Sequence, residues 1–452
     1  MSIRITSNFS LSKLITNYGM LGILIILCLF FSIMTLRDQY PSGENAAKEI
    51  LRPLLKSVSS GENILIISRG NEDDSMFAYL LRSKLIANGF HPPTIISGDP
   101  SKIKSELASF SVSSNKFGII ATTQSFEPVV QNIKVQFSQF SNVRVITPPS
   151  RRWPTFLLPD NLRNVANQIS VIAIIAIGMT MVIITAGIDL SVGSLIALSA
   201  VVTAWLVGQF GGDAASTWGM ILAGLGGMFL CGVIGAFSGL MITGFRIPPF
   251  IATLAMMQVA AGLGYVISQG KPIYHLPDSF ILLGRGAEPL LKIPYAVILM
   301  IVLYIIAHIL MTRTTTGRYI YAVGGNMDAA RLAGIRVKPI LFFVYALCGL
   351  LAGLSGVVMA SQLKSGAPTY GLSYELYVIA AVVVGGTSLS GGEGRIFGTL
   401  IGAFIISVIQ NGMNLTNVES YTQKIVLGLV ILGAVLLDRL KQQGLRARNV
   451  VG

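Results

Sequence analysis

Long apolar stretches separated by short polar segments occupy most of the chain. A membrane-spanning helix needs about 20 mostly apolar residues. Ten stretches meet that length, at residues 17–36, 168–188, 190–209, 217–244, 249–268, 295–312, 340–362, 375–391, 398–415 and 421–438. Glycine and other small residues recur within them, which favours close contact between helices. The pattern predicts an all-α polytopic membrane protein with about ten densely packed transmembrane helices.

One region between the first two stretches has a different pattern. Residues 42–150 alternate between helical and β-rich runs, with an amphipathic helix over 74–87 and strands over 63–68, 94–97, 117–123 and 143–147. Alternation of this kind predicts a small parallel α/β domain. Prolines at 148, 149, 154 and 159 predict a stiff linker back to the membrane.

Composition agrees with this division. The chain of 452 residues is 52% hydrophobic and 12% charged, whereas soluble domains carry about 25% charged residues. Residues 37–167 hold 26 of the 53 charged side chains. We therefore expect four regions: a cytoplasmic N-terminus and first transmembrane helix (1–36), an extracytoplasmic α/β insert (37–159), a transmembrane domain (160–440) and a cytoplasmic basic tail (441–452).

Lysine and arginine residues indicate the orientation. If the N-terminus is cytoplasmic, the inner loops and tails hold thirteen of them and the short outer loops hold five. An excess of this kind marks the cytoplasmic side, so both termini are predicted to be cytoplasmic. The same rule accounts for the net charge of +13, and we expect no nucleic-acid partner. The first stretch lacks a small-residue cleavage site before Arg37 and is predicted to be an uncleaved anchor.

No group of residues typical of a catalytic or metal site is visible. The three histidines are far apart in sequence, and all three cysteines lie in apolar runs. The chain has no G-x-x-x-x-G-K-[ST] motif, so it has no phosphate-binding loop for ATP. Leu389-Ser390-Gly391-Gly392-Glu393 imitates the signature sequence of ATP-binding-cassette (ABC) ATPases. Without a phosphate-binding loop, this segment is better explained as a glycine-rich inner loop or re-entrant turn.

The longest predicted inner loop, residues 313–339, is the most informative segment. It carries five Lys/Arg residues and one acid, Asp328. Asn326 can cap a short helix over Met327–Ala333, and Gly334 can end it. A short cytoplasmic helix with small residues on one side suits docking into a groove on another protein. The alternative is a solvated connector.

Asp189 lies between two apolar stretches, among Gly187, Ser191 and Gly193. Such neighbours indicate a break between two helices. Asp189 or Ser191 could cap a helix at the membrane interface. Alternatively, Asp189 is a hinge or pathway residue, because ionisable groups at membrane depth are costly and are usually retained for function.

Several motifs together resemble a known family. Asp328-Ala329-Ala330, followed after three residues by Gly334, resembles the E-A-A-x-x-x-G coupling loop of ABC importer permeases, with Asp in place of Glu. Longer segments resemble the ribose, xylose and galactose branch of monosaccharide permeases: G-I-D-L-S-V-G-S at 187–194, F-I-A-T-L at 250–254, G-R-Y-I-Y-A-V-G-G-N at 317–326 and G-G-T-S-L at 385–389. The resemblance covers residues ~15–36 and ~160–440 and omits the insert.

The resemblance implies a permease subunit, not an enzyme, in a bacterial inner membrane. It implies a homodimer of ten-helix subunits around a central path, an ABC ATPase subunit that holds ATP and Mg, and an extracytoplasmic sugar-binding protein. This chain would bind no cofactor. The residues expected to couple it to the ATPase are Gly317, Arg318, Asn326, Asp328, Ala329, Ala330, Arg331 and Gly334. Polar residues in or between apolar spans are candidates for the path: Asp189, Thr253, Gln258 and Asn411.

Two other functions remain open. An ion-coupled secondary transporter of a small polar solute would need an ionisable residue in the middle of a span, and the sequence places no acid well inside one. A membrane-anchored sensor would need a cytoplasmic output domain, and the predicted inner segments are all shorter than 30 residues. The insert could be a docking platform for the binding protein or a fused, degenerate ligand-binding lobe. The sequence does not identify the cargo.

Overall fold

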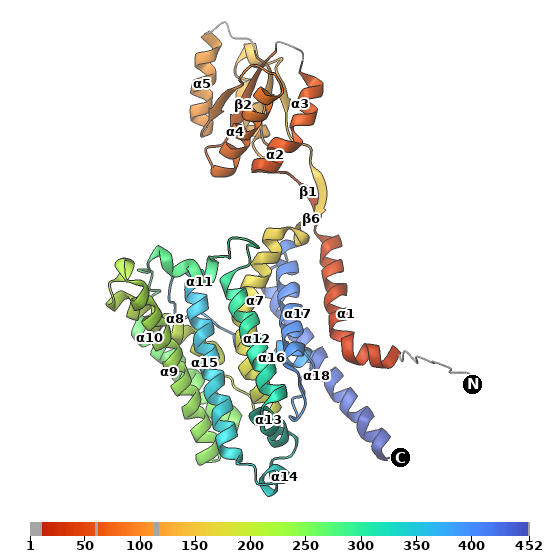
Figure 1. Cartoon of the computed structure of the whole chain (residues 1–452), viewed down its shortest axis with the longest axis vertical. Coiled ribbons are helices and arrows are strands. Elements are labelled where there is room, and N and C mark those ends of the chain that lie inside the picture. The colour runs from red at the N-terminus through yellow and green to blue at the C-terminus, as the bar shows by residue number, and fades with distance from the viewer. Residues whose placement is uncertain (1–10, 59–61, 113–116, 451–452) are drawn as a thin grey trace, which may run out of the picture. The chain divides into compact units, whose positions relative to one another are not determined.

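The computed structural model describes residues 11–58, 62–112 and 117–450, and their side chains over 19–58, 62–110 and 117–436. The chain divides into two units, which Figure 1 shows. Residues 36–155 form one, called here the inserted unit. Residues 1–35 and 156–452 form the other, the helical unit.

Membrane-length helices build the helical unit and confirm the predicted polytopic α-helical class. Seven described helices are long and apolar enough to cross a membrane: α7 (Pro159–Ile184), α8 (Val192–Gln209), α9 (Thr217–Gly244), α10 (Pro249–Ser268), α12 (Tyr295–Arg313), α15 (Val337–Leu363) and α17 (Ile396–Leu415). Shorter apolar segments at Gly19–Met34, Tyr374–Val384 and Ser420–Leu436 lie in α1 (Leu11–Met34), α16 (Tyr374–Val384) and α18 (Ser420–Val450). All ten overlap predicted spans, and among the described residues the first seven have the length to cross a membrane.

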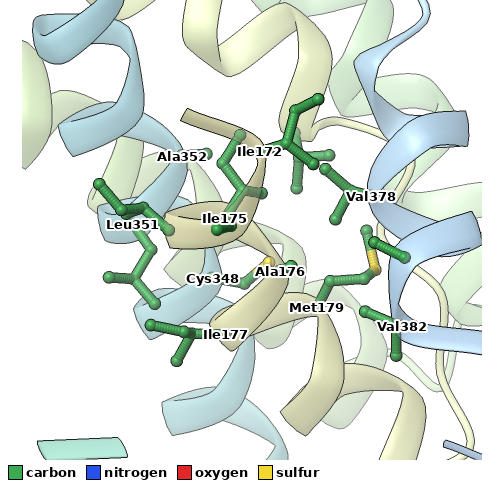
Figure 2. Packing of buried hydrophobic residues seen from close by; sticks show 14 of the residues in the cluster. Ile172, Ile175, Ala176, Ile177, Met179, Cys348, Leu351, Ala352, Val378 and Val382 are labelled. Carbon is green, nitrogen blue, oxygen red and sulfur yellow. The ribbon is translucent and has the colours of Figure 1, made fainter. Parts of the chain in front are cut away.

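Helix α7 is at the centre of the helical unit. Its residues Val171–Ile184 are all buried, and it packs against α12, α15, α16 and α17. Figure 2 shows its isoleucines and methionine between Cys348 and Leu351 of α15 and Val378 and Val382 of α16. A hydrogen bond also joins α12 to α7: the Tyr304 hydroxyl of α12 donates to the Ala173 carbonyl of α7 at 3.0 Å. An apolar helix that other helices enclose therefore forms the core.

Helices α9 and α15 form the most extensive helix pair of this unit. Their axes approach closely because glycines face each other: a Cβ atom at Gly235 would lie 3.0 Å from the Cα of Gly349. Small residues allow such contact where lipid supplies no hydrophobic drive for association. The glycine-rich character of the spans thus serves helix packing.

Helix α16 is shorter than the span predicted over 375–391. It ends at Val384 because Gly385 lies against the Gly398 carbonyl and Gly386 adopts a left-handed conformation with φ +89°. Eleven residues rise only about 16 Å, less than the ~30 Å hydrocarbon core. The chain after α16 is irregular backbone, in which Thr387 and Ser388 are buried and Gly386 and Glu393 are exposed.

The inserted unit is a parallel sheet with helices on both faces. Its strands β2 (Asn63–Ser68), β3 (Thr94–Ser97), β4 (Phe117–Ala121) and β5 (Arg144–Ile146) pair in the order β3-β2-β4-β5. Helices α2 (Gly43–Glu49), α3 (Leu51–Ser57) and α4 (Glu72–Ala87) cover one face, where Ile64 and Ile66 pack. Helices α5 (Pro100–Val112) and α6 (Glu127–Lys134) cover the other, where Leu65 and Ile67 pack.

All four predicted strands and the predicted helix are present, and the strands are parallel. An additional two-stranded ribbon was not predicted. It pairs β1 (Leu36–Gln39) antiparallel with β6 (Arg151–Pro154). The proline-containing segment 148–159 is thus partly a strand, in which Pro154 occupies the last position. Pro159 is the first residue of α7, a position that suits proline.

Candidate coupling segment and transport path

Two short helices occupy the predicted coupling loop between α12 and α15. Helix α13 (Thr315–Gly325) was not predicted, whereas α14 (Met327–Leu332) matches the predicted short helix. The Asn326 side chain accepts a hydrogen bond from the Ala329 N–H at 2.9 Å, so it caps α14 as expected. Gly334 adopts φ +84° two residues after the helix. The local sequence therefore determines both ends of α14.

Helix α14 is anchored on one side and free on the other. Ala330 is buried against Val323 of α13 and Val337 and Leu341 of α15. Leu332 is 90% exposed and Met327 is 38% exposed. Figure 1 shows α14 projecting at one end of the helical unit, beyond α13 and the first turn of α15. An exposed leucine on an anchored, projecting helix suits insertion into an apolar groove of a partner.

The charged residues of α14 are at its surface. Asp328 and Arg331 form an exposed ion pair with an N–O distance of 3.2 Å, and Ala329 is exposed beside them. The sequence analysis selected these residues and missed Leu332. Its apolar side chain in a basic loop could have marked it as a contact residue. An exposed ion pair contributes little stability, so both charges remain free to contact a partner.

Gly317 and Arg318 occupy different surroundings in α13. Gly317 is buried and packs on the Leu310 and Met311 carbonyls at the end of α12, where a side chain would clash. Arg318 is exposed. Gly317 therefore fixes the angle between α12 and α13, while Arg318 adds a cation to the surface of this end.

The end of α13 packs directly on the end of the central helix α7. A Cβ atom at Gly324 would collide with the Ile184 carbonyl, and it would lie 2.8 Å from the backbone nitrogen of Gly392. The Gly392 N–H in turn donates to the Ile184 carbonyl at 2.8 Å. We call Gly324, Ile184 and Gly392 the glycine junction. It connects the coupling segment, the loop after α16 and the central helix without any intervening side chain.

The segment Leu389–Glu393, which imitates an ATPase signature, forms part of this loop. Its glycines Gly391 and Gly392 have φ values of +84° and +76°, a conformation that disfavours other residues. Tyr321 of α13 donates a hydrogen bond to the Gly394 carbonyl at 2.8 Å. The glycines therefore permit a turn that packs on α13, as expected for a glycine-rich loop.

Asp189 lies in the connection between α7 and α8 and is fully buried. Its Oδ1 accepts hydrogen bonds from the Ser191 N–H at 2.9 Å and from the Ser191 hydroxyl at 2.6 Å. Its Oδ2 and the hydroxyl of the nearby Tyr345 have no hydrogen-bond partner among the described residues. Burying such groups without partners is costly. The break between α7 and α8 therefore holds polar groups that another arrangement could satisfy.

Only two of the four predicted path residues come together. Thr253 of α10 is buried and donates a hydrogen bond to the Ile188 carbonyl at 3.2 Å, beside Asp189. Asn411 of α17 instead exchanges two hydrogen bonds with Asn161 in the first turn of α7, at 2.9 and 3.1 Å. Gln258 is exposed on α10. Their assignment to the path stays a prediction.

Gln258 belongs to a polar stripe along α10. Gly262, Tyr265 and Gln269 follow it by four, seven and eleven residues, and all four are exposed. At 100° per residue, Gln258, Gly262 and Tyr265 fall within about 60° of one another around the helix, and Gln269 follows directly after the last helical residue, Ser268. Of the seven long apolar helices, α10 is the least enclosed by the rest of the described chain. Gln258 could be selected from the sequence as a polar residue in an apolar span, whereas the stripe is visible only once the exposed face of α10 is known.

Sequence comparison decides the family. Residues 161–435 match the family described as "branched-chain amino acid transport system / permease component". The chain belongs to this permease family. The ribose import permease protein RbsC of Escherichia coli K12 is 46% identical over 293 residues, which cover 64% of this chain and 88% of that protein. RbsC of Bacillus subtilis is 47% identical over 290 residues, covering 64% and 87%.

A more distant relative is the D-allose transport system permease protein AlsC of Escherichia coli K12. It is 39% identical over 285 residues, which cover 63% of this chain and 85% of that protein. No solved structure matches the chain. These relatives confirm the resemblance to monosaccharide importer permeases. The family match begins after the inserted unit, as the motifs indicated.

Proposed function

We propose that the chain is the transmembrane subunit of an ABC importer for a monosaccharide, driven through α14 by a separate ATPase subunit. Permeases named for ribose and D-allose are its relatives, which supports a sugar as cargo. The projecting α14, with Leu332 exposed and Ala330 anchored, is the observation that carries the ATPase assignment. Both termini and α14 are cytoplasmic in this proposal, and the inserted unit is extracytoplasmic.

Force from the ATPase would enter the permease through the glycine junction. A groove on the ATPase receives Leu332, and closure of the ATPase around nucleotide moves α14 together with α13. Because Gly324 lies against the Ile184 carbonyl, that movement reaches α7 directly. Closely packed elements shift between discrete arrangements, so α7 and the Asp189 connection would exchange inward-open and outward-open states. The ATPase holds ATP and Mg in this scheme and drives the exchange by binding nucleotide more tightly in one state.

A second copy of the chain would complete the path along α10. Gln258 lies near the middle of an apolar helix of 20 residues and is exposed in the single chain. A polar side chain facing lipid is costly, so this face requires protein or a water-filled path beside it. Gly262 has open space around it, which leaves room for a neighbouring helix or a solute. Two copies meeting near the polar stripe satisfy both requirements.

A sugar-binding protein would deliver cargo at the extracytoplasmic end. The inserted unit, which lies outside the family match, would contribute either as a docking platform for that protein or as a fused ligand-binding lobe. Its parallel sheet with helices on both faces is compatible with each role.

An ion-coupled secondary transporter is the second candidate, and one observation favours it. Asp189 is enclosed and one of its oxygens has no hydrogen-bond partner within the described residues, as expected for a carboxylate that binds a proton or cation. That mechanism assigns no role to the exposed Leu332 or the glycine junction.

The proposal is tested by replacing Leu332 with Asp and measuring how much ATPase subunit co-purifies from membranes in mild detergent. Leu290 provides a matched control, because it is a leucine 84% exposed in the segment between α11 (Leu282–Arg285) and α12. A central apolar anchor contributes 2 kcal/mol or more to an interface, so Leu332→Asp should lower capture by about tenfold or more. Leu290→Asp should leave capture unchanged. Equal capture by both variants would refute the docking role of α14.

A further inference from the structure

A cavity of about 870 Å³ opens where α8 and α10 end. Trp205 and Gln209 line it from the last turns of α8, and Ser268 and Gln269 line it from the end of α10. Asp213 and His275 complete it from the two loops that follow these helices. In the proposed orientation this end of the helical unit is extracytoplasmic.

Unusual backbone conformations shape the cavity. Gly211 and Gly212 adopt φ values of +116° and +57° after α8, and Gln269 adopts φ +52° after α10. A left-handed conformation is unfavourable for a residue other than glycine, and strained residues of this kind cluster at functional sites. The Nδ1 atom of His275 lies 3.6 Å from a carboxylate oxygen of Asp213, so the two loops meet at the cavity.

The lining has the chemistry that recognises a sugar. Trp205 is 44% exposed, and an indole offers a flat apolar surface together with an N–H donor. The side-chain amides of Gln209 and Gln269 make no hydrogen bond to any described residue, and both are exposed. Amides and the Asp213 carboxylate supply donors and acceptors that match ring hydroxyls. The volume lies within the range of about 300–1,000 Å³ typical of small-molecule sites.

The polar stripe of α10 leads from this cavity into the membrane region. Gln269 follows the last residue of α10 and lines the cavity. Tyr265 lies in the last turn of the helix, and Gln258 lies about 15 Å along the axis from its last residue, Ser268. Hydrogen-bonding side chains are therefore exposed at three depths, at Gln269, Tyr265 and Gln258. A hydroxylated solute could exchange hydrogen bonds along this face.

We propose that this cavity is a receiving site for the monosaccharide on the permease itself. The sugar ring stacks on Trp205, and its hydroxyls bond to Gln209, Asp213 and Gln269 before the sugar moves along the α10 stripe. This inference rests on the proposed import function. It assigns the chain a weak sugar site of its own, distinct from the binding protein.

Tryptophan fluorescence of the purified full chain tests the site. The chain contains three tryptophans, and replacing Trp153 and Trp218 with Phe leaves Trp205 as the only one. Titration with D-ribose, D-allose or L-arabinose should produce a saturable change in Trp205 emission for at least one sugar. Gln269→Ala in the same background should abolish that change. A chain retaining only Trp218, which is 74% exposed and does not line the cavity, should show no saturable change.

Transport measurements separate this site from the import function itself. Trp205→Ala should raise the KM for uptake by about tenfold, the effect of losing roughly 1.4 kcal/mol of binding. Trp205→Phe should have a KM close to that of wild type. Both variants should capture the ATPase and the binding protein normally. No saturable change with any of the three sugars, together with uptake in Trp205→Ala equal to wild type, would overturn the site. Import would survive that result if Leu332→Asp still prevented ATPase capture. Loss of binding-protein capture in Trp205→Ala would also overturn it, because the cavity would then be a docking contact.

Discussion

Gly324 and Gly325 are adjacent but have different surroundings. A Cβ atom at Gly324 would collide with the Ile184 carbonyl, whereas one at Gly325 would meet open space. Gly324→Ala must therefore separate α13 from α7, and Gly325→Ala need not move any atom. We expect Gly324→Ala to lower the initial rate of sugar uptake by about tenfold or more, and Gly325→Ala to change it by less than about twofold.

Uptake should be normalised to the amount of chain in the membrane, because a clash in a packed region can also reduce folding. The informative result is a Gly324→Ala chain that reaches the membrane and captures the ATPase but does not transport. Normal uptake by this variant would show that contact between α13 and α7 is not needed for coupling.

Asp74, in the first turn of α4, predicts a pH dependence for the inserted unit. Burial raises the pKa of its carboxyl above the unfolded value, so the folded unit holds this proton more tightly than the unfolded chain does. Its contribution to stability is fully present below the unfolded pKa and is lost as pH rises through the folded pKa. Asp74→Asn should therefore stabilise the unit relative to wild type at pH 7, and this advantage should shrink as pH falls.

Urea unfolding followed by Trp153 fluorescence measures this effect, in a chain whose Trp205 and Trp218 are replaced with Phe. Asp38→Asn is the control, because Asp38 is an exposed acid of the same unit and its charge is not among the causes that shift the Asp74 pKa. Its unfolding midpoint should stay at a constant distance from wild type across the pH range. A pH-independent difference between Asp74→Asn and wild type would contradict the assignment.

Some candidate residues could be predicted because their role is local. Asn326 and Gly334 occupy the cap positions that their side chains favour. Leu332 could not be selected in the same way, because its 90% exposure depends on how α14 packs against α15. The pairing of Asn411 with Asn161, 250 residues away, is likewise set by the tertiary fold.

At the scale of elements, α14 depends on its cap. The six-residue helix is too short to be stable alone, so the hydrogen bond from the Ala329 N–H to Asn326 carries much of its order. Asn326→Ala should destabilise α14 by about 1 kcal/mol, and Asn326→Asp should retain the cap. Hydrogen exchange of a peptide covering α14 should accelerate in Asn326→Ala and stay near wild type in Asn326→Asp.

Uptake should follow the same order. Asn326→Ala should transport more slowly than wild type, and Asn326→Asp should recover most of the rate. Equal exchange and equal uptake in both variants would show that α14 is held by its contact through Ala330 alone.

Elements were predictable where apolar periodicity and length were sufficient. The seven membrane-length helices and all four strands of the parallel sheet followed from such patterns. One helix and one two-stranded ribbon could not be predicted in this way. Helix α13 has glycines near both ends, a pattern that is typical of a loop. It is helical because Ile320 and Val323 are buried against neighbouring helices. Strands β1 and β6 are separated by more than 110 residues, so no local signal joins them.

At the scale of the whole molecule, the helical unit should fold without the inserted unit. The Phe156 N–H donates a hydrogen bond to the Thr35 hydroxyl at 3.1 Å, so the two ends left by removing residues 36–155 are already adjacent. We expect a chain with a short glycine linker in place of these residues to insert in the membrane. ATPase capture should remain within about twofold of wild type, because α14 belongs to the other unit.

The same deletion separates the two roles of the inserted unit. Loss of binding-protein capture, with no sugar binding attributable to the unit in the full chain, would support a docking platform. Loss of a sugar-binding signal, with capture retained, would support a ligand-binding lobe. If the deleted chain failed to insert or to hold the ATPase, the helical unit would depend on the inserted unit for folding.

Sugar accumulation in proteoliposomes tests the central claim most directly, namely that a nucleotide-driven partner moves cargo through this permease. The chain is reconstituted with its ATPase, and the binding protein is loaded with labelled ribose outside. Accumulation above the external concentration should require ATP on the ATPase side and should persist when ionophores dissipate the proton and sodium gradients. Accumulation that continues without ATP and stops with the ionophores would contradict the account and establish ion-coupled transport.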